Sequence, residues 1–225
     1  MWVVAHRGGG ALFPENSITA FQSVAALGVD FIECDVHLSS DGHLMVVHDR
    51  SLKRTANLDV NVDSLSRQEL AALNVGDGHG VPALEDVLNA VDARLRVELK
   101  TPETLNALIA LLERRPAWRE RMTPTSFNHQ LMRDLNAAIP GLLTGALLAG
   151  LPVHPGAVAR DASCQFLSLQ YGMLNRAYVD HCHQEGILLT AWTPNQEEEI
   201  QALVDMGIDG ITSDRPDLVI AARRP

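Results

Sequence analysis

Residues 31–55, FIECDVHLSSDGHLMVVHDRSLKRT, bring two acids, a tight-turn signal and a histidine close together. Residues 31–37 are rich in β-branched and aromatic side chains, which predicts a strand. Side chains alternate between the two faces of a strand, so Glu33 and Asp35 point to one side. Cys34 points to the other side, where we expect it to pack against a helix. The stretch therefore predicts a pair of carboxylates on one face of a sheet.

A second strand is predicted at residues 44–48, and Asp41-Gly42 between the two strands is a favoured dipeptide for a two-residue hairpin. With these two residues as the loop, Asp35 faces His48 on the same side of the ribbon. An imidazole would then lie beside the carboxylate pair. The alternative is that these polar side chains simply line the solvated face of an antiparallel ribbon.

Strand-like apolar runs recur along the whole chain, and segments with helical periodicity separate most of them. The runs cover residues 2–6, 31–37, 44–48, 95–99, 123–127, 142–148, 166–169, 187–192 and 210–213. The helical segments include residues 17–27, 102–114, 130–138, 174–184 and 196–206. The link into the run at residues 44–48 is too short for a crossover, so this strand must return antiparallel. The other eight strands predict a closed (β/α)8 barrel, an α/β fold.

The length of 225 residues suits one such barrel, so we expect a single domain over residues 1–225. A short hairpin and loop insertion is predicted near the mouth, at about residues 49–83. Its glycine-rich loop at residues 75–82 is either a lid or an ordinary mobile loop. Asn16 is the predicted N-cap of the first helix, and Ser66 begins a capping-box pattern.

Composition limits the partners and the compartment. The formal net charge is -10 and basic residues form no run longer than a pair such as Arg223-Arg224, so we expect no nucleic-acid partner. Cys34, Cys164 and Cys182 form no CxxC pair, which favours a reducing compartment. The first residues lack the features of a signal peptide, and no apolar run approaches the ~20 residues of a membrane span. We expect a cytoplasmic protein without stable membrane association, and the sequence carries no signal for its oligomeric state.

Polar side chains mark the carboxyl ends of neighbouring predicted strands, where barrels of this kind collect their functional groups. The first strand ends in His6 and Arg7, followed by three glycines. The strand at residues 95–99 places Glu98 and Lys100 on one face. Such clustering at strand ends favours an active site over a solvated ribbon.

Three carboxylates, from Glu33, Asp35 and Glu98, lie at this predicted site, where Cys34 points to the opposite face and no HExxH motif is nearby. Oxygen ligands of this kind suit a hard divalent cation, Mg²⁺ or Ca²⁺. A bound cation would relieve their repulsion and leave positions for a phosphate oxygen. Arg7 and Lys100 can hold the remaining phosphate oxygens.

His6 and His48 both titrate near neutrality. A pair of histidines at one site can act as base toward a nucleophile and as acid toward a leaving alkoxide. The sequence does not decide which histidine is the base, or whether water or a substrate hydroxyl attacks first. Together with the acids and the two cations, these residues predict phosphodiester hydrolysis.

Long, ordered motifs run nearly from end to end of the chain: AHRGGG, PENS, IECDVHLSSDGHLMVVHD, VPALEDVL, VELK, TSF, AWTPN and GITSDRPD. In these motifs the chain resembles the glycerophosphodiester phosphodiesterases. The resemblance implies a TIM-type barrel and metal-dependent hydrolysis of a glycerophosphodiester to sn-glycerol 3-phosphate and an alcohol. It implies His6 and His48 as the acid/base pair, Arg7 and Lys100 at the phosphate, Glu15 in the polar network around the phosphate- and substrate-binding site, and Glu33, Asp35 and Glu98 as metal ligands.

Other side chains are weaker candidates. Trp192 and Phe127 stand near strand ends, where they either contact the glycerol or alcohol group or pack in the core. The run His181-Cys182-His183 looks like a metal cluster, but residues two apart on a helix do not face each other. We therefore expect these three residues at the surface.

Three functions compete. The leading hypothesis is hydrolysis of soluble glycerophosphodiesters such as glycerophosphocholine, glycerophosphoethanolamine or glycerophosphoglycerol. The second keeps the chemistry but takes lysophospholipids as substrates, in the manner of a lysophospholipase D. No amphipathic membrane helix or basic patch supports that alternative. The third is a non-catalytic barrel that binds phosphodiesters, which would not need a pair of proton-transferring histidines.

Overall fold

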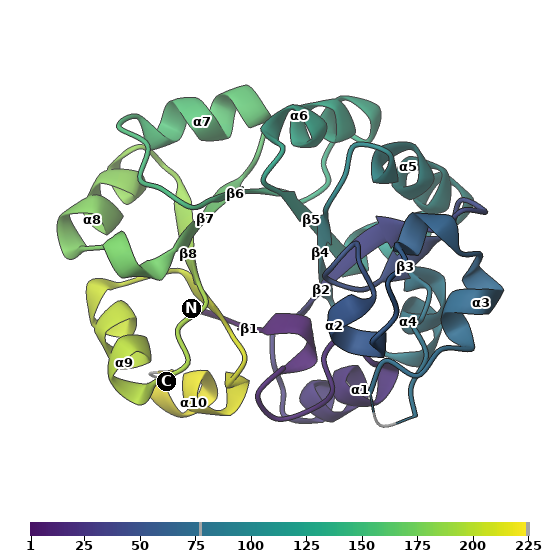
Figure 1. Cartoon of the computed structure of the whole chain (residues 1–225). Helices are drawn as coiled ribbons and strands as arrows, with labels where there is room; N and C mark the ends of the chain where they lie inside the picture. The colour runs from purple at the N-terminus through teal and green to yellow at the C-terminus, as the bar shows by residue number, and fades with distance from the viewer. Residues whose placement is uncertain (77, 224–225) are drawn as a thin grey trace.

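Eight parallel strands close into a barrel in the computed structural model, which describes residues 1–76 and 78–223 (Figure 1). The strands are β1 (Trp2–Ala5), β2 (Phe31–Leu38), β4 (Leu95–Leu99), β5 (Met122–Ser126), β6 (Gly145–Leu148), β7 (Phe166–Gln170), β8 (Leu188–Trp192) and β9 (Gly210–Ser213). β1 pairs with both β2 and β9, which closes the ring. The predicted (β/α)8 barrel is confirmed.

Helices surround the barrel and cover the outward faces of its strands (Figure 1). They are α1 (Ile18–Ala26), α4 (Leu84–Ala90), α5 (Thr104–Arg114), α6 (His129–Ala138), α7 (Pro155–Ala162), α8 (Arg176–Gln184), α9 (Glu197–Met206) and α10 (Pro216–Ala222). Short 3₁₀ helices stand at η1 (His6–Gly8), η3 (Pro116–Arg121) and η4 (Tyr171–Met173). Buried apolar side chains between strands and helices form the main core, and Cys34 belongs to it as predicted.

The first helix begins one residue later than predicted. The hydroxyl of Ser17 accepts a hydrogen bond from the backbone N–H of Ala20, so Ser17 is the N-cap and not Asn16. Asn16 instead has a left-handed backbone, with φ of 55°, and its side-chain amide donates to Asp35 Oδ2 at 3.1 Å. A residue expected to cap a helix therefore supports an acid of the predicted site. The capping box that starts at Ser66 is confirmed.

The hairpin after β2 has a three-residue loop, where the sequence predicted two residues. β3 (Leu44–Val46) is antiparallel to β2, and Val36 pairs with Val46. Gly42 alone is left-handed in this loop, with φ of 82°, as in the three-residue hairpins that end in a glycine bulge. The side chain of Asp41 instead accepts a hydrogen bond from Ser39 Oγ at 2.6 Å.

This one-residue shift makes the predicted pairing of Asp35 with His48 wrong. The backbone N–H of Val47 donates to the carbonyl of Asp35 at 3.0 Å, and β3 has already ended at Val46. His48 leaves the ribbon, and its carbonyl oxygen lies 3.0 Å from His37 Nε2. The histidine therefore reaches the barrel mouth from a turn and not from a paired strand.

The segment after the hairpin packs beside β3 at one edge of the molecule (Figure 1). It carries α2 (Lys53–Ala56), η2 (Val62–Ser64) and α3 (Arg67–Ala71). A second, smaller core holds it together, made of Met45, Val47, Leu52, Val62, Leu70, Val81 and Ala83. Asp77 of the glycine-rich loop and Arg224 of the C-terminal basic pair lie outside the described residues. The choice between a lid and an ordinary mobile loop stays open, and the single domain over residues 1–225 stays a prediction.

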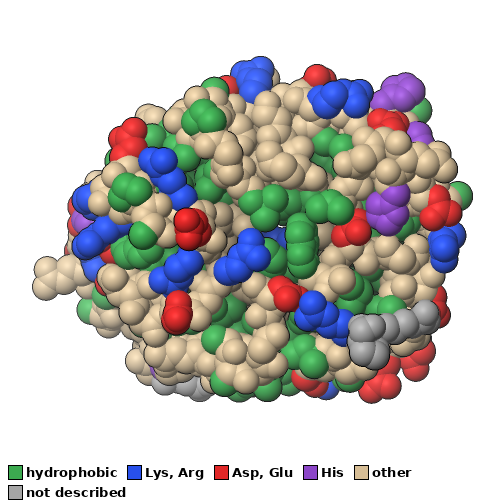
Figure 2. All heavy atoms as spheres, turned by 180° about the vertical axis from the view of Figure 1, so that it is seen from behind, with side chains coloured by type: hydrophobic (Ala, Val, Ile, Leu, Met, Phe, Trp, Pro, Cys, Tyr) green, Lys and Arg blue, Asp and Glu red, His purple; other side chains and the backbone are tan. Residues whose placement is uncertain are grey.

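Charged side chains of both signs surround a group of hydrophobic side chains on the face opposite to that of Figure 1 (Figure 2). A helix that is both long and apolar enough to cross a membrane is not found in residues 1–76 and 78–223.

Aromatic rings close the barrel interior at the amino ends of its strands. Trp2, Phe31 and Phe166 are the first residues of β1, β2 and β7, and the Trp2 ring lies edge-on to both phenyl rings, with centroids 5.5 and 5.8 Å apart. Phe31 and Phe166 are 1% and 0% exposed. Gly145 leaves room for this floor, because a Cβ there would lie 2.2 Å from the Phe166 ring.

We expect Gly145→Ala to lower the free energy of unfolding by about 1 to 3 kcal/mol, because the extra methyl overpacks the floor. Gly150→Ala is the matched control, since a Cβ at Gly150 meets no atom within 4 Å. The control should change stability by less than about 0.5 kcal/mol. Urea unfolding of the three proteins measures both effects, and equal midpoints for all three would contradict a tightly packed floor.

Candidate active site

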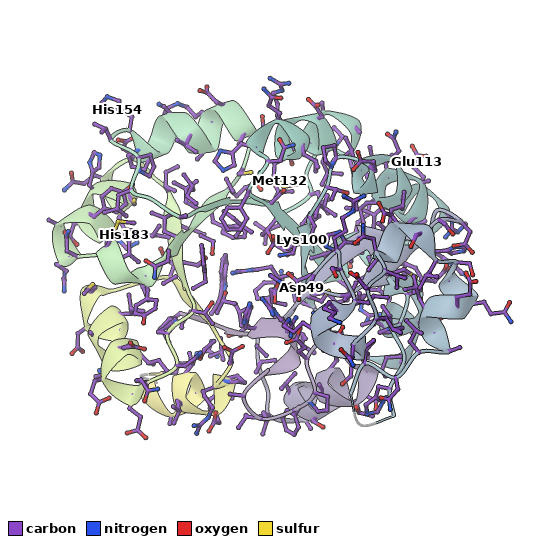
Figure 3. The ribbon with its side chains drawn as sticks, viewed as in Figure 1. Asp49, Lys100, Glu113, Met132, His154 and His183 are labelled. Carbon is purple, nitrogen blue, oxygen red and sulfur yellow. The ribbon has the colours of Figure 1, made fainter. Side chains whose placement is uncertain are left out.

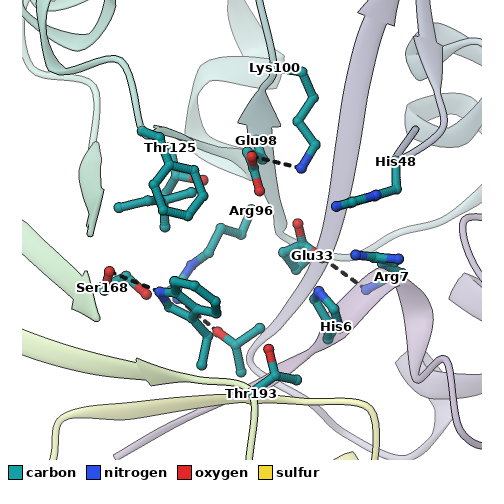
Figure 4. A pocket seen from close by; sticks show the side chains of 14 residues that line it. His6, Arg7, Glu33, His48, Arg96, Glu98, Lys100, Thr125, Ser168 and Thr193 are labelled. Atoms are coloured by element: carbon teal, nitrogen blue, oxygen red, sulfur yellow. Dashed lines mark hydrogen bonds and ion pairs between the residues drawn. The ribbon is translucent and has the colours of Figure 1, made fainter. Parts of the chain in front are cut away.

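Three carboxylates, from Glu33, Asp35 and Glu98, converge at the barrel mouth on β2 and β4. Figure 4 shows two of them, Glu33 and Glu98, in the pocket. Asp35 and Glu98 are register partners on these neighbouring strands, and Glu33 stands one alternation earlier on β2. One oxygen from each of the three acids lies within 4.8 Å of the others. The side chains of Asp35 and Glu98 are 1% and 13% exposed, and Glu33 is 5% exposed. The structure thus brings the three predicted acids together in a nearly water-free position.

The charge state of these acids depends on burial and on their neighbours. Burial raises the pKa of Glu33 to about 7, and the negative charge of Asp35 adds to the effect. Burial would also raise the pKa of Asp35, but the positive charges of Lys100, His48 and Arg7 outweigh it and lower this pKa to about 2. The pKa of Glu98 is raised, chiefly by burial, despite the nearby Lys100. Acids in such a cluster gain from a bound cation.

Two cations flank the acids. Lys100 Nζ lies 2.8 Å from Asp35 Oδ1 and 2.7 Å from Glu98 Oε1. Arg7 Nε lies 3.5 Å from Asp35 Oδ2, and the backbone N–H of Arg7 donates to Glu33 Oε2 at 2.9 Å. Arg7 holds a left-handed backbone, with φ of 49°, which is rare for a residue with a side chain. This conformation turns its backbone N–H toward the acid.

Both predicted histidines lie in the same pocket, and each is held by an aspartate. His6 Nδ1 lies 2.7 Å from Asp214 Oδ1, and His48 Nδ1 lies 2.6 Å from Asp49 Oδ1. An aspartate on Nδ1 fixes the tautomer in which Nδ1 carries the proton and Nε2 is free to accept one. Each imidazole is therefore prepared to exchange a proton through Nε2.

The two histidines differ in their electrostatic surroundings. Burial lowers the pKa of His6, but the hydrogen bond with Asp214 and the charge of Glu33 outweigh it, so this pKa is raised. Burial also lowers the pKa of His48, and here the charge of Asp35 does not compensate, so the pKa stays below its usual value. The two histidines therefore titrate at different pH values, a difference that would suit one acid and one base at a site.

Asp49 and Asp214 are site residues that the sequence analysis missed, although both carry a signal. Asp49 directly follows His48, and Asp214 follows the last residue of β9, which places it at the carboxyl end of a strand like the predicted site residues. Asn195 holds Asp214 in place, since its Nδ2 donates to Asp214 Oδ2 at 2.8 Å. In the side-chain view, Asp49 and Lys100 lie toward the barrel centre, whereas His154 and His183 lie on the outer side (Figure 3).

Glu15 takes part in a network beside the pocket and is not among the residues that line it. Arg54 Nη1 and Nη2 donate to the two oxygens of Glu15 at 3.0 and 2.7 Å, and Arg54 Nε donates to Asp49 Oδ2 at 2.5 Å. Glu15 Oε1 also lies 3.5 Å from Arg7 Nη1. The network links the loop after β1 to the aspartate that holds His48, a connection that the sequence did not reveal.

The pocket at the barrel mouth encloses about 170 Å³. Its lining combines predicted site residues with hydroxyl and apolar side chains: His6, Arg7, Glu33, His48, Arg96, Glu98, Lys100, Thr125, Phe127, Leu147, Ser168, Trp192, Thr193 and Thr212. Trp192 Nε1 donates to the carbonyl of Ser168 at 3.1 Å, and its ring meets Phe127 edge-on at 5.6 Å. Both aromatic candidates therefore lie at the pocket and not in the core between strands and helices.

The side chains of His181, Cys182 and His183 point in different directions, because consecutive residues of a helix lie on different faces. His181 and His183 are partly exposed and pair with Glu185 and Asp209 at 3.2 and 2.8 Å. Cys182 is fully buried, so the expectation that it lies at the surface is wrong. Position 182 faces the strands, whereas its two neighbours face outward.

We expect Asp214→Asn and Asp49→Asn each to lower kcat by about 10- to 100-fold, the usual effect of losing a partner that orients a site residue. Loss of the Asp214 carboxylate should also lower the pKa of His6, because this hydrogen bond raises it. The pH–rate profile of Asp214→Asn should then shift to lower pH on the limb that His6 controls. Asp180→Asn, an exposed residue paired with Arg176 on α8, is the control. An unchanged rate and profile would show that Asp214 does not position His6.

The buried Glu33 also predicts how stability depends on pH in metal-free protein. Its folded pKa of about 7 exceeds the ordinary 4.5, so the folded state binds this proton more tightly than the unfolded state. The stabilisation is complete below the ordinary value and is lost as pH rises to about 7. Between these pH values the wild-type protein should lose on the order of 3 kcal/mol of its free energy of unfolding through Glu33. Glu33→Gln has no carboxyl group at this position and should not show this loss.

The measurement is the melting temperature of both proteins in chelator, at about pH 5 and about pH 8. Wild type should lose more stability than Glu33→Gln between the two values. The low pKa of Asp35 does not affect stability between these two pH values. The stabilisation that it contributes is lost only at lower pH, as the pH falls toward about 2. Parallel curves for the two proteins would contradict a raised pKa at Glu33.

Comparison with known proteins gives a consistent result over nearly the whole chain. The model of the glycerophosphoryl diester phosphodiesterase family matches residues 6–218. A glycerophosphodiester phosphodiesterase of Caldanaerobacter subterraneus subsp. tengcongensis is 32% identical, over 97% of this chain and 96% of its own. A probable glycerophosphodiester phosphodiesterase 2 of Mycobacterium tuberculosis is 34% identical, over 96% and 88%. The crystal structure of a putative glycerophosphoryl diester phosphodiesterase from Silicibacter pomeroyi superimposes with a TM-score of 0.90 and 25% identity, over 99% of this chain and 92% of its own.

Proposed function

The chain belongs to the glycerophosphoryl diester phosphodiesterase family, and we propose that it hydrolyses soluble glycerophosphodiesters to sn-glycerol 3-phosphate and an alcohol. One observation carries the proposal for this chain. Two histidines, each held by an aspartate through Nδ1, share a pocket with three acids and two cations. A barrel that only binds phosphodiesters has no need of two imidazoles with oriented, free Nε2 atoms.

The three acids fit a divalent cation as part of this proposal. They offer oxygen atoms only, lie within 4.8 Å of one another and are buried, and the raised pKa of Glu33 reflects the cost of holding these charges together. Glu33, Asp35 and Glu98 would hold the ion, and Mg²⁺ or Ca²⁺ suits this donor set. When bound, the ion supplies a Lewis acid that polarises the phosphoryl group.

The residues of the chain then have separate tasks. Arg7 and Lys100 stand beside the acids and hold the phosphate oxygens that carry negative charge. One histidine takes a proton from the attacking water or substrate hydroxyl, and the other gives a proton to the leaving alkoxide through Nε2. Asp49 and Asp214 keep both rings in the required tautomer and orientation, and the network of Arg54 and Glu15 holds Asp49. Trp192 contacts the organic part of the substrate.

We place this reaction in the cytoplasm. Cys34, Cys164 and Cys182 are all buried as free thiols, which is the usual state of cysteines in a reducing compartment.

A coupled assay for sn-glycerol 3-phosphate tests the proposal. Glycerophosphocholine, glycerophosphoethanolamine and glycerophosphoglycerol are each incubated with the protein and with Mg²⁺, Ca²⁺ or chelator. We expect release of sn-glycerol 3-phosphate with at least one of the two ions and none with chelator. No release from any of the three diesters with either ion would overturn the proposed function.

A further inference from the structure

Arg96 lies deeper in the barrel than any predicted site residue of β4. It precedes Glu98 by one alternation on β4 and is one of the residues that line the pocket (Figure 4). It is 2% exposed, and burial lowers the pKa of its guanidinium to about 10, which still leaves it positively charged at neutral pH. A permanent cation therefore forms part of the pocket floor.

The guanidinium lies over the rings of Phe166, Phe31 and Trp2, but it is short of hydrogen-bond partners. Within residues 1–76 and 78–223, Arg96 forms no ion pair, and its Nε and Nη2 have no hydrogen-bond partner. Its Nη1 donates to the hydroxyls of Thr190 and Thr212 at 3.5 and 3.3 Å, which are long distances for a charged donor. Buried polar groups are nearly always paired, so an under-used guanidinium at a pocket points to a ligand that completes it.

Aromatic rings pack beneath Arg96. The guanidinium carbon lies 4.7 and 5.4 Å from the ring centroids of Phe166 and Phe31, which with Trp2 form the packed floor of the barrel. Glycines stand next to these aromatic residues. Gly145 lies against Phe166, and Gly210 lies against Trp2, where a Cβ at Gly210 would lie 3.1 Å from Trp2 Cβ. A group that points down from the acids must therefore end at Arg96.

The two arms of a bound diester then have different surroundings. The phosphate is fixed near the acids and cations, so one arm points down toward the aromatic floor and the other points out of the pocket, which holds about 170 Å³ in all. The pocket lining also carries the hydroxyl groups of Ser168, Thr125 and Thr212, and the Thr212 hydroxyl lies 3.3 Å from Arg96 Nη1. Donors and acceptors of this kind match the free hydroxyls of glycerol, whereas the variable alcohol suits the open side.

Resting on the proposed function, we propose that Arg96 recognises the free terminal hydroxymethyl group of the glycerol arm. The guanidinium donates a hydrogen bond to that hydroxyl, and the closed floor leaves no path for a chain attached to it. The substrate class is then the fully deacylated glycerophosphodiester. Lysophospholipids, which carry an acyl chain on this oxygen, are excluded by Arg96 and the floor.

Three choline esters of matched chemistry test the proposal, with choline release as the common readout. They are glycerophosphocholine, its analogue 2-hydroxyethyl phosphocholine, which lacks only the hydroxymethyl group, and 1-hexanoyl-glycerophosphocholine as a water-soluble lysophospholipid. Wild type should prefer glycerophosphocholine to the analogue by about 10- to 100-fold in kcat/KM, the value of a hydrogen bond to a charged group. The hexanoyl compound should not be cleaved.

Arg96→Met should lower kcat/KM for glycerophosphocholine to that of the analogue and leave the analogue unchanged. Arg94→Met is the control, because Arg94 is exposed and also packs on Phe31, at 4.4 Å, but does not line the pocket. The comparison of the three substrates on wild type stands even if Arg96→Met does not fold.

Equal losses for both substrates in Arg96→Met, no preference in wild type, or efficient cleavage of the hexanoyl compound would each overturn the proposal. If wild type with Mg²⁺ or Ca²⁺ cleaved none of the three compounds, the proposed function would fall and this inference with it. Cleavage of glycerophosphocholine without discrimination would overturn the role of Arg96 alone.

Discussion

Replacing His6 or His48 with alanine is expected to lower kcat for glycerophosphocholine by about 10²- to 10⁴-fold, the usual contribution of a general acid or base. Each ring lies in the pocket with Nδ1 bonded to an aspartate, so only Nε2 is left to exchange a proton with substrate. Alanine removes that atom and leaves the three acids in place. We therefore expect a loss in rate with little change in metal affinity.

The measurement is kcat for both variants beside metal affinity by titration calorimetry. His181→Ala is the matched control, because His181 is a partly exposed histidine on α8 that pairs with Glu185 outside the pocket. It should retain the wild-type rate. A His6→Ala or His48→Ala protein that folds, binds metal and keeps a near wild-type kcat would show that the ring does not transfer a proton.

Replacing Glu33, Asp35 or Glu98 with alanine is expected to have the largest effect, loss of both metal binding and turnover. The loss of a group that merely supports a ligand costs about 10- to 100-fold, so the loss of a ligand itself should exceed that. Asp35→Ala should be the most severe of the three. Its carboxylate is 1% exposed and also holds Lys100 and Arg7 in position, at 2.8 and 3.5 Å.

The test is a Mn²⁺ titration followed by electron paramagnetic resonance, with kcat measured on the same samples. Glu113→Ala on the outer side of α5 removes an exposed acid far from the mouth and serves as the control (Figure 3). It should bind metal and turn over as wild type does. Wild-type metal affinity in all three site variants would mean that these acids do not hold the ion.

The sequence predicted the barrel because its signals are local. Alternating apolar runs and helical segments set the order of the elements. The pairing of β1 with both β2 and β9, which closes the barrel, follows from the number of parallel strands. The acids on β2 and β4 were also predictable, because strand periodicity places Glu33, Asp35 and Glu98 on the inner face.

The hairpin register was not predictable from the dipeptide alone. Asp41-Gly42 fits both a two-residue loop and the end of a three-residue loop. The three-residue loop needs a single left-handed residue, and in this structure that residue is Gly42. His48 reaches the pocket in spite of this one-residue error, because the chain leaves the ribbon after Val46.

The remaining site residues depend on contacts between distant parts of the chain. Asp214 and His6 form a hydrogen bond although they are 208 positions apart in the sequence, and Arg96 and Thr212 do so at a separation of 116 positions. No local sequence pattern joins either pair. Arg96 also lies on the inner face of a strand, where a charged residue alone does not reveal whether it has a partner. Closure of the barrel brings these residues together.

The most direct test of a metal-dependent active site is stoichiometric reactivation of wild-type protein. Protein treated with chelator is assayed for sn-glycerol 3-phosphate release from glycerophosphocholine while Mg²⁺ or Ca²⁺ is added back and bound metal is counted. We predict no turnover before addition and a rise in proportion to bound metal that ends at one ion per chain. Full turnover by protein shown to contain no metal would contradict the role assigned to Glu33, Asp35 and Glu98.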